Sequence, residues 1–377
     1  MKSKKVRVDF RKNRSERTRI GDWTRKFEEH GFEEEAEVSV ERVGGKGELT
    51  RRRTVIGGLA DDAKQRGNAG FAVLPDVDTE KLMAGRVLRV HGASSVVQTE
   101  EGRQFHCVTR RVLKTLSTDQ RQPVVTGDRV WIRPAPTENE GMIERVEPRT
   151  GMIARTSKLR KHVIVANVDQ VLIIASAAEP VLKPNLIDRM ILTAEQSGVQ
   201  PVICINKIDL VNPAELQPTA GVYAQMGYKV LMLSVETGYG LEHLKRLLKN
   251  RSSVVSGQSG VGKSSLLNAV DPQLQLRVAE VGNAQKGRHT TTTADLIELS
   301  FGGYVADTPG LRQFMLWDII PEEVFGLFRD LRPYESLCHF PDCTHSHEDD
   351  CAVKIAVGEG RLDLRRYESY LAIRFGK

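Results

Sequence analysis

Between residues 158 and 316, short apolar runs alternate with segments in which apolar residues recur at helical spacing. Residues 171–175 are apolar without interruption, which is typical of a strand buried on both faces of a sheet. Residues 186–196 have the spacing of an amphipathic helix, and further strands are expected at 202–206, 230–234 and 253–256. This alternation predicts a parallel sheet with helices on both faces. Such sheets bind ligands at the carboxyl ends of their strands.

The pattern differs on either side of this region. Before it, short strand-like runs are separated by turn residues, which predicts a small β-barrel. The expected barrel strands are residues 86–90, 95–99, 104–108, 129–132 and 142–146. From residue 321 the pattern is helical, apart from an interruption between Cys338 and Cys351. A small helical domain is therefore expected at the C-terminal end.

Composition narrows the class of protein. A chain of 377 residues with 40% hydrophobic content can bury more than one core. The longest apolar run is far shorter than the ~20 residues of a membrane-spanning helix, and no apolar segment follows the basic N-terminus as a secretory signal requires. We therefore expect a cytoplasmic protein whose five cysteines are reduced.

The net charge of +6 is unevenly distributed. Residues 1–26 contain eleven lysines and arginines against three acidic residues, a balance of +8. Such an arm does not fold alone, but it can release counterions from a phosphate backbone, and RNA contact is one interpretation. The other is a solvated tail that the acidic residues of 28–37 neutralise.

The element Gly257-x4-Gly262-Lys263-Ser264 follows an expected strand and opens an expected helix, a context that indicates a phosphate-binding loop. Backbone N–H groups and the positive end of the helix dipole surround the β-phosphate in such a loop. Lys263 is expected to reach the β- and γ-phosphates, and the Ser264 hydroxyl to bind Mg²⁺. The residues expected to contact the nucleotide here are Gly257, Gln258, Ser259, Gly260, Val261, Gly262, Lys263, Ser264 and Ser265.

The element Asn206-Lys207-Ile208-Asp209 follows another expected strand. A carboxylate can accept two hydrogen bonds from guanine, from N1–H and from the exocyclic amine, whereas adenine has no such donor pair. Adenine would leave Asp209 desolvated and unpaired, so Asp209 is expected to select GTP over ATP. A third element, Asp307-Thr308-Pro309-Gly310, follows an expected strand at residues 303–306. Asp307 is expected to hold the Mg²⁺ shell through water, and the Gly310 N–H to contact the γ-phosphate.

These three elements occur in a rotated order. An ordinary GTPase has its phosphate loop near the N-terminus and its NKxD element after DxxG, whereas here NKxD comes first and DxxG last. Over roughly residues 83–377, the chain resembles the circularly permuted GTPases of the RsgA/YjeQ family. Residues 124–131, with Gly127 and Asp128, are similar to the signature of the family's OB-fold domain. Residues 366–370 are similar to the family's last helix.

The resemblance implies a multi-domain fold. An OB-fold β-barrel is expected at residues 83–156, a circularly permuted P-loop α/β GTPase domain at 157–318, and a small helical zinc-binding domain at 319–377. Residues 1–82 lie outside the common core and are expected to form a disordered extension, first basic and then acidic. On the barrel, Arg110, Arg111, Lys114 and Arg121 could supply a nucleic-acid face, although a merely soluble surface explains them equally well.

The resemblance also implies a function. The chain is expected to be a monomeric GTPase that binds the small ribosomal subunit and its rRNA, assists late maturation, and is stimulated by the subunit. The alternative is an RNA-binding or ribosome-binding scaffold with a vestigial nucleotide site. Intact Lys263, Ser264, Asp307 and Asp209 argue against that alternative. An ATPase or kinase is disfavoured by the NKID element and by the lack of an evident acceptor site.

Several roles rest on the resemblance. Asn206 is expected to brace the guanine loop, Lys207 to lie along the base plane, and the loop beginning at Ser234 to support the base from its other side. Residues 286–292 are similar to the family's first switch, in which Thr291 is expected to bind Mg²⁺, with Thr290 as the alternative.

Catalysis departs from the better-known GTPase template, in which a glutamine after DxxG orients the attacking water. Here Leu311 follows Gly310, and a leucine cannot orient water. Intrinsic hydrolysis is expected to be slow. His289 is the candidate that supplies the missing polar group, and a surface histidine without a catalytic role is the alternative.

A group of cysteines and one histidine suggests a metal site. Cys338-x4-Cys343-x-His345-x5-Cys351 supplies three thiolates and one imidazole, which close a tetrahedral Zn²⁺ shell and leave no open position for catalysis. The site is therefore expected to be structural, and its spacing also matches the family's zinc pattern. His339 and His347 are further imidazoles nearby that could compete as ligands. Cys107 and Cys204 are expected to be small buried hydrophobic residues.

Overall fold

The computed structural model describes residues 4–9, 52–59, 73–75, 77–116, 123–157, 160–276, 294–307 and 320–376. The chain divides into two compact units, Met1–Asn167 and Val168–Lys377. Within the described ranges, no helix has the length and apolar character needed to cross a membrane. The finer domain boundaries at residues 82, 156 and 318 stay predictions.

The first unit contains a closed barrel with the strand order β4-β5-β6-β8-β7, as the sequence predicts. Its strands are β4 (Met83–His91), β5 (Ser94–Thr99), β6 (Gln104–Thr109), β7 (Arg129–Pro134) and β8 (Glu140–Val146), and α3 (Arg111–Leu116) follows β6. Successive side chains of a strand point to opposite faces, so alternate apolar residues fill the interior. Val97, Phe105, Ile132 and Ile143 are among these buried residues.

The OB-fold signature has a structural role in this unit. The Arg149 guanidinium donates from Nε to Asp128 Oδ1 at 2.7 Å, and both side chains are buried. Asp128 Oδ2 also accepts from the Val125 N–H at 2.8 Å. Gly127 has φ +88°, and a Cβ there would lie 2.1 Å from the Ala166 carbonyl oxygen. The glycine is therefore required by close backbone approach, and the aspartate by a buried ion pair.

Two smaller sheets complete the described part of the first unit. β1 (Lys4–Asp9), β2 (Arg52–Leu59) and β3 (Val73–Pro75) form an antiparallel sheet, and β9 (Met152–Ser157) pairs with β10 (Arg160–Ala166). The first sheet lies within residues 1–82, for which the sequence predicts disorder. Most of that segment lies outside the described residues, so the prediction stays open.

The second unit contains a six-stranded sheet with the order β13-β12-β11-β14-β16-β15. Its strands are β11 (Gln170–Ser176), β12 (Gln200–Asn206), β13 (Lys229–Met232), β14 (Ser252–Ser256), β15 (Asp295–Glu298) and β16 (Tyr304–Asp307). All neighbouring pairs are parallel except β15 with β16. Six of the seven β11 residues are buried, which explains its continuous apolar run.

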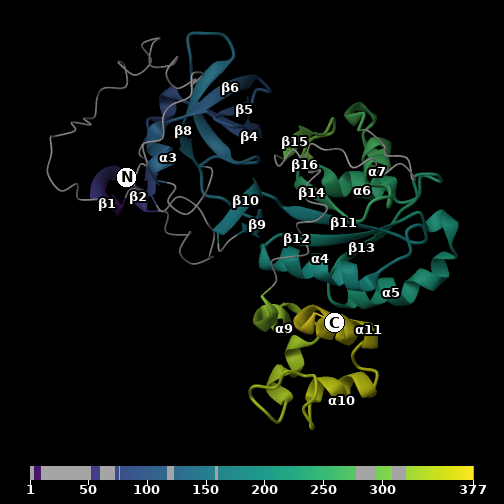
Figure 1. Cartoon of the computed structure of the whole chain (residues 1–377). Coiled ribbons are helices and arrows are strands. Elements are labelled where there is room, and N and C mark those ends of the chain that lie inside the picture. The colour runs from purple at the N-terminus through teal and green to yellow at the C-terminus, as the bar shows by residue number, and fades with distance from the viewer. Residues whose placement is uncertain are drawn as a thin grey trace. The chain divides into compact units, whose positions relative to one another are not determined.

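Helices cover both faces of this sheet, as predicted. Figure 1 shows α4 (Pro184–Gln196) and α5 (Pro213–Gln225) on one face, and α6 (Leu241–Leu248) and α7 (Lys263–Val270) on the other. The core between the sheet and α6 and α7 includes Leu172, Cys204, Leu244 and Leu266. The turns that follow β11, β12 and β14 therefore meet at one edge of the sheet.

The C-terminal part of this unit is helical, as predicted. It contains the short α9 (Val324–Leu327), then α10 (Ala352–Gly358) and α11 (Leu364–Phe375), with 3-10 turns at Pro321–Glu323 and Arg332–Leu337. Phe325, Phe328, Leu331 and Tyr370 are buried together in a core that also includes Leu192 of α4.

Candidate functional site

The phosphate-loop sequence forms the turn between β14 and α7. Its glycines have positive φ at Gly257, Gly260 and Gly262. A Cβ at Gly257 would lie 2.1 Å from the Ile174 carbonyl oxygen, and one at Gly262 would lie 2.5 Å from Asn206 Nδ2. Only glycine fits both positions, because the loop passes directly against its neighbours. The Lys263 ammonium donates to the carbonyl oxygens of Gly257 and Gln258.

The Asn206 side chain joins the NKID element to the phosphate loop. Asn206 is the last residue of β12, and its Nδ2 donates to the Val261 carbonyl at 2.8 Å. Lys207 has φ +61°, and its ammonium donates to the Glu179 carbonyl. The bond to Val261 holds Asn206 against the phosphate loop, and its role in bracing the guanine loop stays a prediction. The Glu179 contact was missed, because a backbone carbonyl partner leaves no signal in the sequence.

Asp209 lies beside the loop that begins at Ser234. Ser234 Oγ donates to Asp209 Oδ1 at 2.5 Å and accepts from the Thr237 N–H at 3.1 Å. These hydrogen bonds fix the carboxylate against the neighbouring loop. Through these hydrogen bonds the structure joins the NKID element to the loop at Ser234 and to the phosphate loop, which are separate segments of the sequence.

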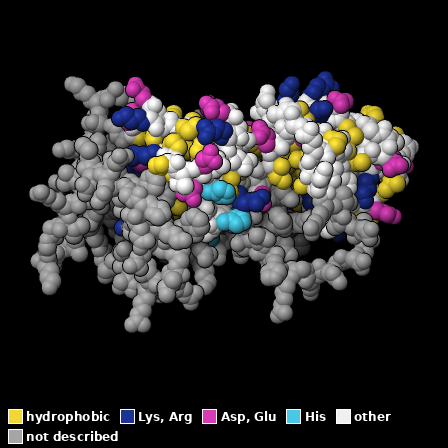
Figure 2. All heavy atoms as spheres, turned by 90° about the horizontal axis from the view of Figure 1, so that it is seen from above, with side chains coloured by type: hydrophobic (Ala, Val, Ile, Leu, Met, Phe, Trp, Pro, Cys, Tyr) yellow, Lys and Arg dark blue, Asp and Glu magenta, His cyan; other side chains and the backbone are white. Residues whose placement is uncertain are grey.

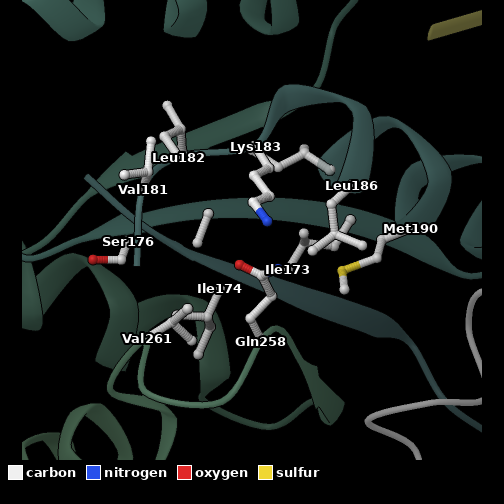
Figure 3. A pocket seen from close by; sticks show the side chains of 12 residues that line it. Ile173, Ile174, Ser176, Val181, Leu182, Lys183, Leu186, Met190, Gln258 and Val261 are labelled. Carbon is white, nitrogen blue, oxygen red and sulfur yellow. The ribbon is translucent and has the colours of Figure 1, made fainter. Parts of the chain in front are cut away.

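An apolar pocket lies between the phosphate loop and the start of α4. Ile173, Ile174 and Met190 are among the residues that line it, and Lys183 and Gln258 point toward one another across it (Figure 3). Met190 Sδ also accepts from Ser256 Oγ, the residue directly before the loop. Helix α4 therefore contacts the residue that leads into the phosphate loop.

The predicted switch residues are only partly described. Asp307 ends β16, where its backbone pairs with Asp295. The carboxyl end of β16 lies at the same edge of the sheet as the phosphate loop, because β16 pairs in parallel with β14. His289, Thr290, Thr291 and Gly310 lie outside the described residues, so their roles stay predictions.

The four predicted metal ligands come together in the C-terminal helical part. One ligand atom from each of Cys338, Cys343, His345 and Cys351 lies within 4.8 Å of the others. His345 Nδ1 is 3.4 Å from the Cys338 sulfur and 3.5 Å from the Cys351 sulfur. Burial raises the pKa of Cys343 to about 12 and lowers the pKa of His345. A divalent cation would favour the thiolates instead, so this donor set fits a metal ion.

Glu348 shapes the turn that carries His345. Its carboxylate accepts hydrogen bonds from the Thr344 hydroxyl and from the N–H groups of Thr344 and Ser346. Burial opposes its ionisation, but these hydrogen bonds hold the pKa of Glu348 below its ordinary value. The ionised carboxylate therefore fixes the loop, and no sequence argument had given it this role.

Helix α11 connects the metal-ligand loop to α4. Tyr367 donates to the His345 carbonyl and Tyr370 to the Thr344 carbonyl, each at 2.7 Å. On the side toward α4, Arg366 Nη1 donates to Asp188 Oδ1 at 2.6 Å, and Ser369 donates to Asn185. These contacts give residues 366–370, which resemble the family's last helix, a structural role.

Arg366 is a buried charge with two carboxylate partners. Its side chain is 2% exposed and pairs with Asp330 as well as Asp188. The Tyr223 hydroxyl also donates to Asp188. Burial opposes the charge of Arg366, yet the Asp330 hydrogen bond and both carboxylates hold its pKa above the ordinary value. The guanidinium therefore stays protonated.

Replacing Arg366 with methionine is expected to destabilise the second unit by about 3–5 kcal/mol, because two carboxylates lose their buried partner. Urea unfolding of the full chain measures this loss. Arg365→Met is the matched control, since that side chain is 40% exposed and pairs with Asp363 at the surface. The control is expected to cost less than about 1 kcal/mol. Equal losses in the two variants would contradict this account.

A phosphate loop joined to an NKID element in rotated order defines a class of protein, the circularly permuted GTPases. The family model described as RsgA GTPase matches residues 146–317. Two relatives carry the name small ribosomal subunit biogenesis GTPase RsgA. The one from Chlorobaculum parvum is 39% identical over 78% of this chain and 97% of its own. The one from Gemmatimonas aurantiaca is 43% identical, over 77% and 96%.

Solved structures give the same result. YjeQ from Thermotoga maritima matches with a TM-score of 0.65 and 35% identity, over 78% of this chain and 98% of its own. YloQ, described as a circularly permuted GTPase, matches with a TM-score of 0.62 and 29% identity, over 80% and 96%. The chain therefore belongs to the RsgA family and is a GTP-hydrolysing enzyme.

Proposed function

We propose that this GTPase is a switch that binds the small ribosomal subunit, assists its late maturation, and is stimulated by the subunit. The observation that carries the nucleotide part is the Asn206 to Val261 hydrogen bond, which joins the guanine-reading element to the phosphate loop. A ligand that satisfies both elements must carry both guanine and a polyphosphate. The names of the relatives from Chlorobaculum parvum and Gemmatimonas aurantiaca support the cellular context.

In this proposal the Lys263 ammonium exchanges two loop carbonyls for β- and γ-phosphate oxygens. Its present acceptors, the Gly257 and Gln258 carbonyls, lie in the loop that would surround the phosphates. Ser264, at the start of α7, would help to hold Mg²⁺, which would supply positive charge beside the phosphates.

Guanine would bind beside the Asp209 carboxylate. Its N1–H and amine donate to Asp209, which Ser234 holds in place, while Lys207 lies along the base. Hydrolysis would then depend on the switch residues. Asp307 and Thr291 would hold Mg²⁺, the Gly310 N–H would contact the γ-phosphate, and His289 would orient water where Leu311 cannot.

The metal in the Cys338, Cys343, His345 and Cys351 cluster is proposed to be Zn²⁺. Three thiolates and one imidazole are soft and borderline donors, which favour zinc over Mg²⁺ or Ca²⁺. These four residues would hold the ion between them and would leave no position for a substrate. The metal would therefore supply folding energy to the loop rather than reaction chemistry.

We further propose that the protein acts as a monomer in the cytoplasm and contacts rRNA there. Reduced cysteines of the metal cluster fit that compartment. The basic arm of residues 1–26 supports contact with a phosphate backbone.

The full chain is expected to hydrolyse GTP slowly alone and roughly 10²-fold faster with purified small subunits, because ordering a water-orienting group is worth about that much. Phosphate release with and without subunits measures the effect. Lys263→Ala is the control and is expected to show no turnover in either condition. Equal rates with and without subunits would refute the stimulated switch.

A further inference from the structure

The outer face of the barrel carries an aromatic ring among arginines. Along β7, Val130 and Ile132 enter the core, so Arg129, Trp131 and Arg133 point outward. In the sheet register, Trp131 lies opposite Ala84 of β4 and Arg145 of β8. The half-buried indole thus has cationic side chains along its own strand and across the sheet. Its cross-strand neighbour Ala84 is small.

One carboxylate fixes the ring and its neighbour. Trp131 Nε1 donates to Glu147 Oε1 at 2.6 Å, and Arg145 Nη2 lies 2.7 Å from the same oxygen. The indole plane and the guanidinium are therefore held in a defined relation before any partner arrives. Such preorganisation reduces the entropy lost on binding.

A second carboxylate holds two further arginines. Glu144 is 2% exposed, and it lies 2.9 Å from Arg110 Nη1 and 3.2 Å from Arg133 Nε. The two arginine side chains are 38% and 44% exposed. Each guanidinium has five N–H donors, so each arginine keeps further donors beyond the one that binds Glu144. Their exposed donors can bind an acceptor from solvent.

We call this set the Trp131 platform; its members are Arg110, Arg129, Trp131, Arg133 and Arg145, with the supporting carboxylates Glu144 and Glu147. Four guanidinium groups against two carboxylates leave the platform positively charged. Figure 2 shows basic and acidic side chains interspersed over the described surface it presents. On that face, basic side chains do not gather in one patch, so local geometry must identify a binding surface.

Among the described residues, the β5 and β6 side of the barrel does not combine an aromatic platform with several arginines. OB-fold domains commonly bind oligonucleotides on their second and third strands, here β5 and β6. On β6, Phe105 is buried beneath Arg103, and the exposed ring is His106. The turn between these strands also presents the exposed acidic residues Glu100 and Glu101. Of the described barrel strands, β7 therefore offers the better platform for a polyanion with planar bases.

We propose that the Trp131 platform binds single-stranded RNA, with a base stacked on the indole and the flanking phosphates bound by the arginines. Every base has a π face, and guanidinium groups bind phosphate in bidentate fashion. This inference rests on the proposed function for the source of the RNA, and it deepens that function by naming the contact face. It shares Arg110 with the face expected from the sequence, but Trp131 and the arginines of β7 and β8 carry the contact in place of Arg111, Lys114 and Arg121.

The test measures binding of the full chain to a labelled oligouridine of about 12 nucleotides, a length within the site size of one OB-fold. Fluorescence anisotropy gives the Kd for this probe and for an abasic probe of the same length. Trp131→Ala is expected to weaken oligouridine binding about 10-fold and to leave abasic binding unchanged, whereas Trp131→Phe keeps most of the affinity. The abasic probe separates stacking from the charge of the N-terminal arm.

Arg129→Ala provides a second variant that does not disturb the core, because this side chain is exposed. It is expected to weaken both probes and to reduce the slope of log K against log salt by about one. Arg103→Ala, at the residue directly before β6, is the matched control and is expected to bind like the unmodified chain. Circular dichroism confirms that each variant is folded.

Unchanged oligouridine affinity in folded Trp131→Ala and Arg129→Ala would overturn the proposal, as would an equal loss in Arg103→Ala. If the platform variants keep RNA affinity but lose binding to purified small subunits, the platform binds protein and the proposal is wrong. Failure of the proposed function gives a different result, because small subunits would then not stimulate GTP hydrolysis by the unmodified chain.

Discussion

Asp209→Asn is expected to lower the affinity for GTP by about 10³-fold and to shift preference toward xanthosine triphosphate. The substitution replaces one carboxylate acceptor with an NH₂ donor, which would face a donor of guanine and leave both groups unpaired in a desolvated site. Xanthine presents a carbonyl oxygen at the position of the guanine amine, so it can accept from asparagine. Ser234 can still donate to the remaining side-chain oxygen, so the loop geometry is expected to persist.

Titration calorimetry with GTP, ATP and xanthosine triphosphate measures this change. Glu236→Gln is the matched control, because Glu236 is an exposed carboxylate in the adjacent loop. It is expected to leave all three affinities unchanged. The guanine-reading role of Asp209 would be wrong if Asp209→Asn bound GTP within about threefold of the unmodified chain, or if the unmodified chain bound ATP as well as GTP.

On the proposal that the cluster binds zinc, Cys343→Ser is expected to lower the zinc content and to unfold the loop from Cys338 to Cys351. Structural zinc sites supply apparent binding energies of about 10–16 kcal/mol, which act as folding energy. Loss of one thiolate leaves Cys338, His345 and Cys351 with an incomplete shell. GTP affinity is expected to change little, because the Asn206 and Asp209 hydrogen bonds do not involve this loop. The affinity for small subunits is expected to become the same for the GTP-bound and the GDP-bound protein.

Metal analysis and limited proteolysis follow the first two effects, and sedimentation with small subunits follows the third. His347→Ala is the control, since its side chain is 82% exposed and lies outside the cluster. It is expected to keep a full complement of zinc. Full zinc content in Cys343→Ser would refute the ligand assignment. Subunit binding that still differs between the GTP-bound and GDP-bound forms of the zinc-free variant would refute the third expectation.

The local sequence determined the chemistry of the sites. A phosphate loop requires glycine where its backbone passes within reach of Ile174 and Asn206, and those steric demands appear in the sequence as Gly257 and Gly262. The candidate metal-ligand cluster could also be predicted, because one loop supplies all four donors from Cys338 to Cys351. The parallel sheet was predicted because a strand buried on both faces, such as β11, leaves an uninterrupted apolar run.

Only the tertiary structure decided which distant residues act together. The Arg366 to Asp188 pair joins residues 178 positions apart, and Trp131 meets Glu147 only after β7 and β8 pair. A charged residue has the same local signature whether it is solvated or buried against a partner, so neither pair could be predicted from spacing. The sequence by itself therefore determined which single loops carry the candidate nucleotide-binding and metal-ligand residues. The tertiary structure decided how α11 and α4 join them, because burial and pairing depend on segments that approach only in the folded chain.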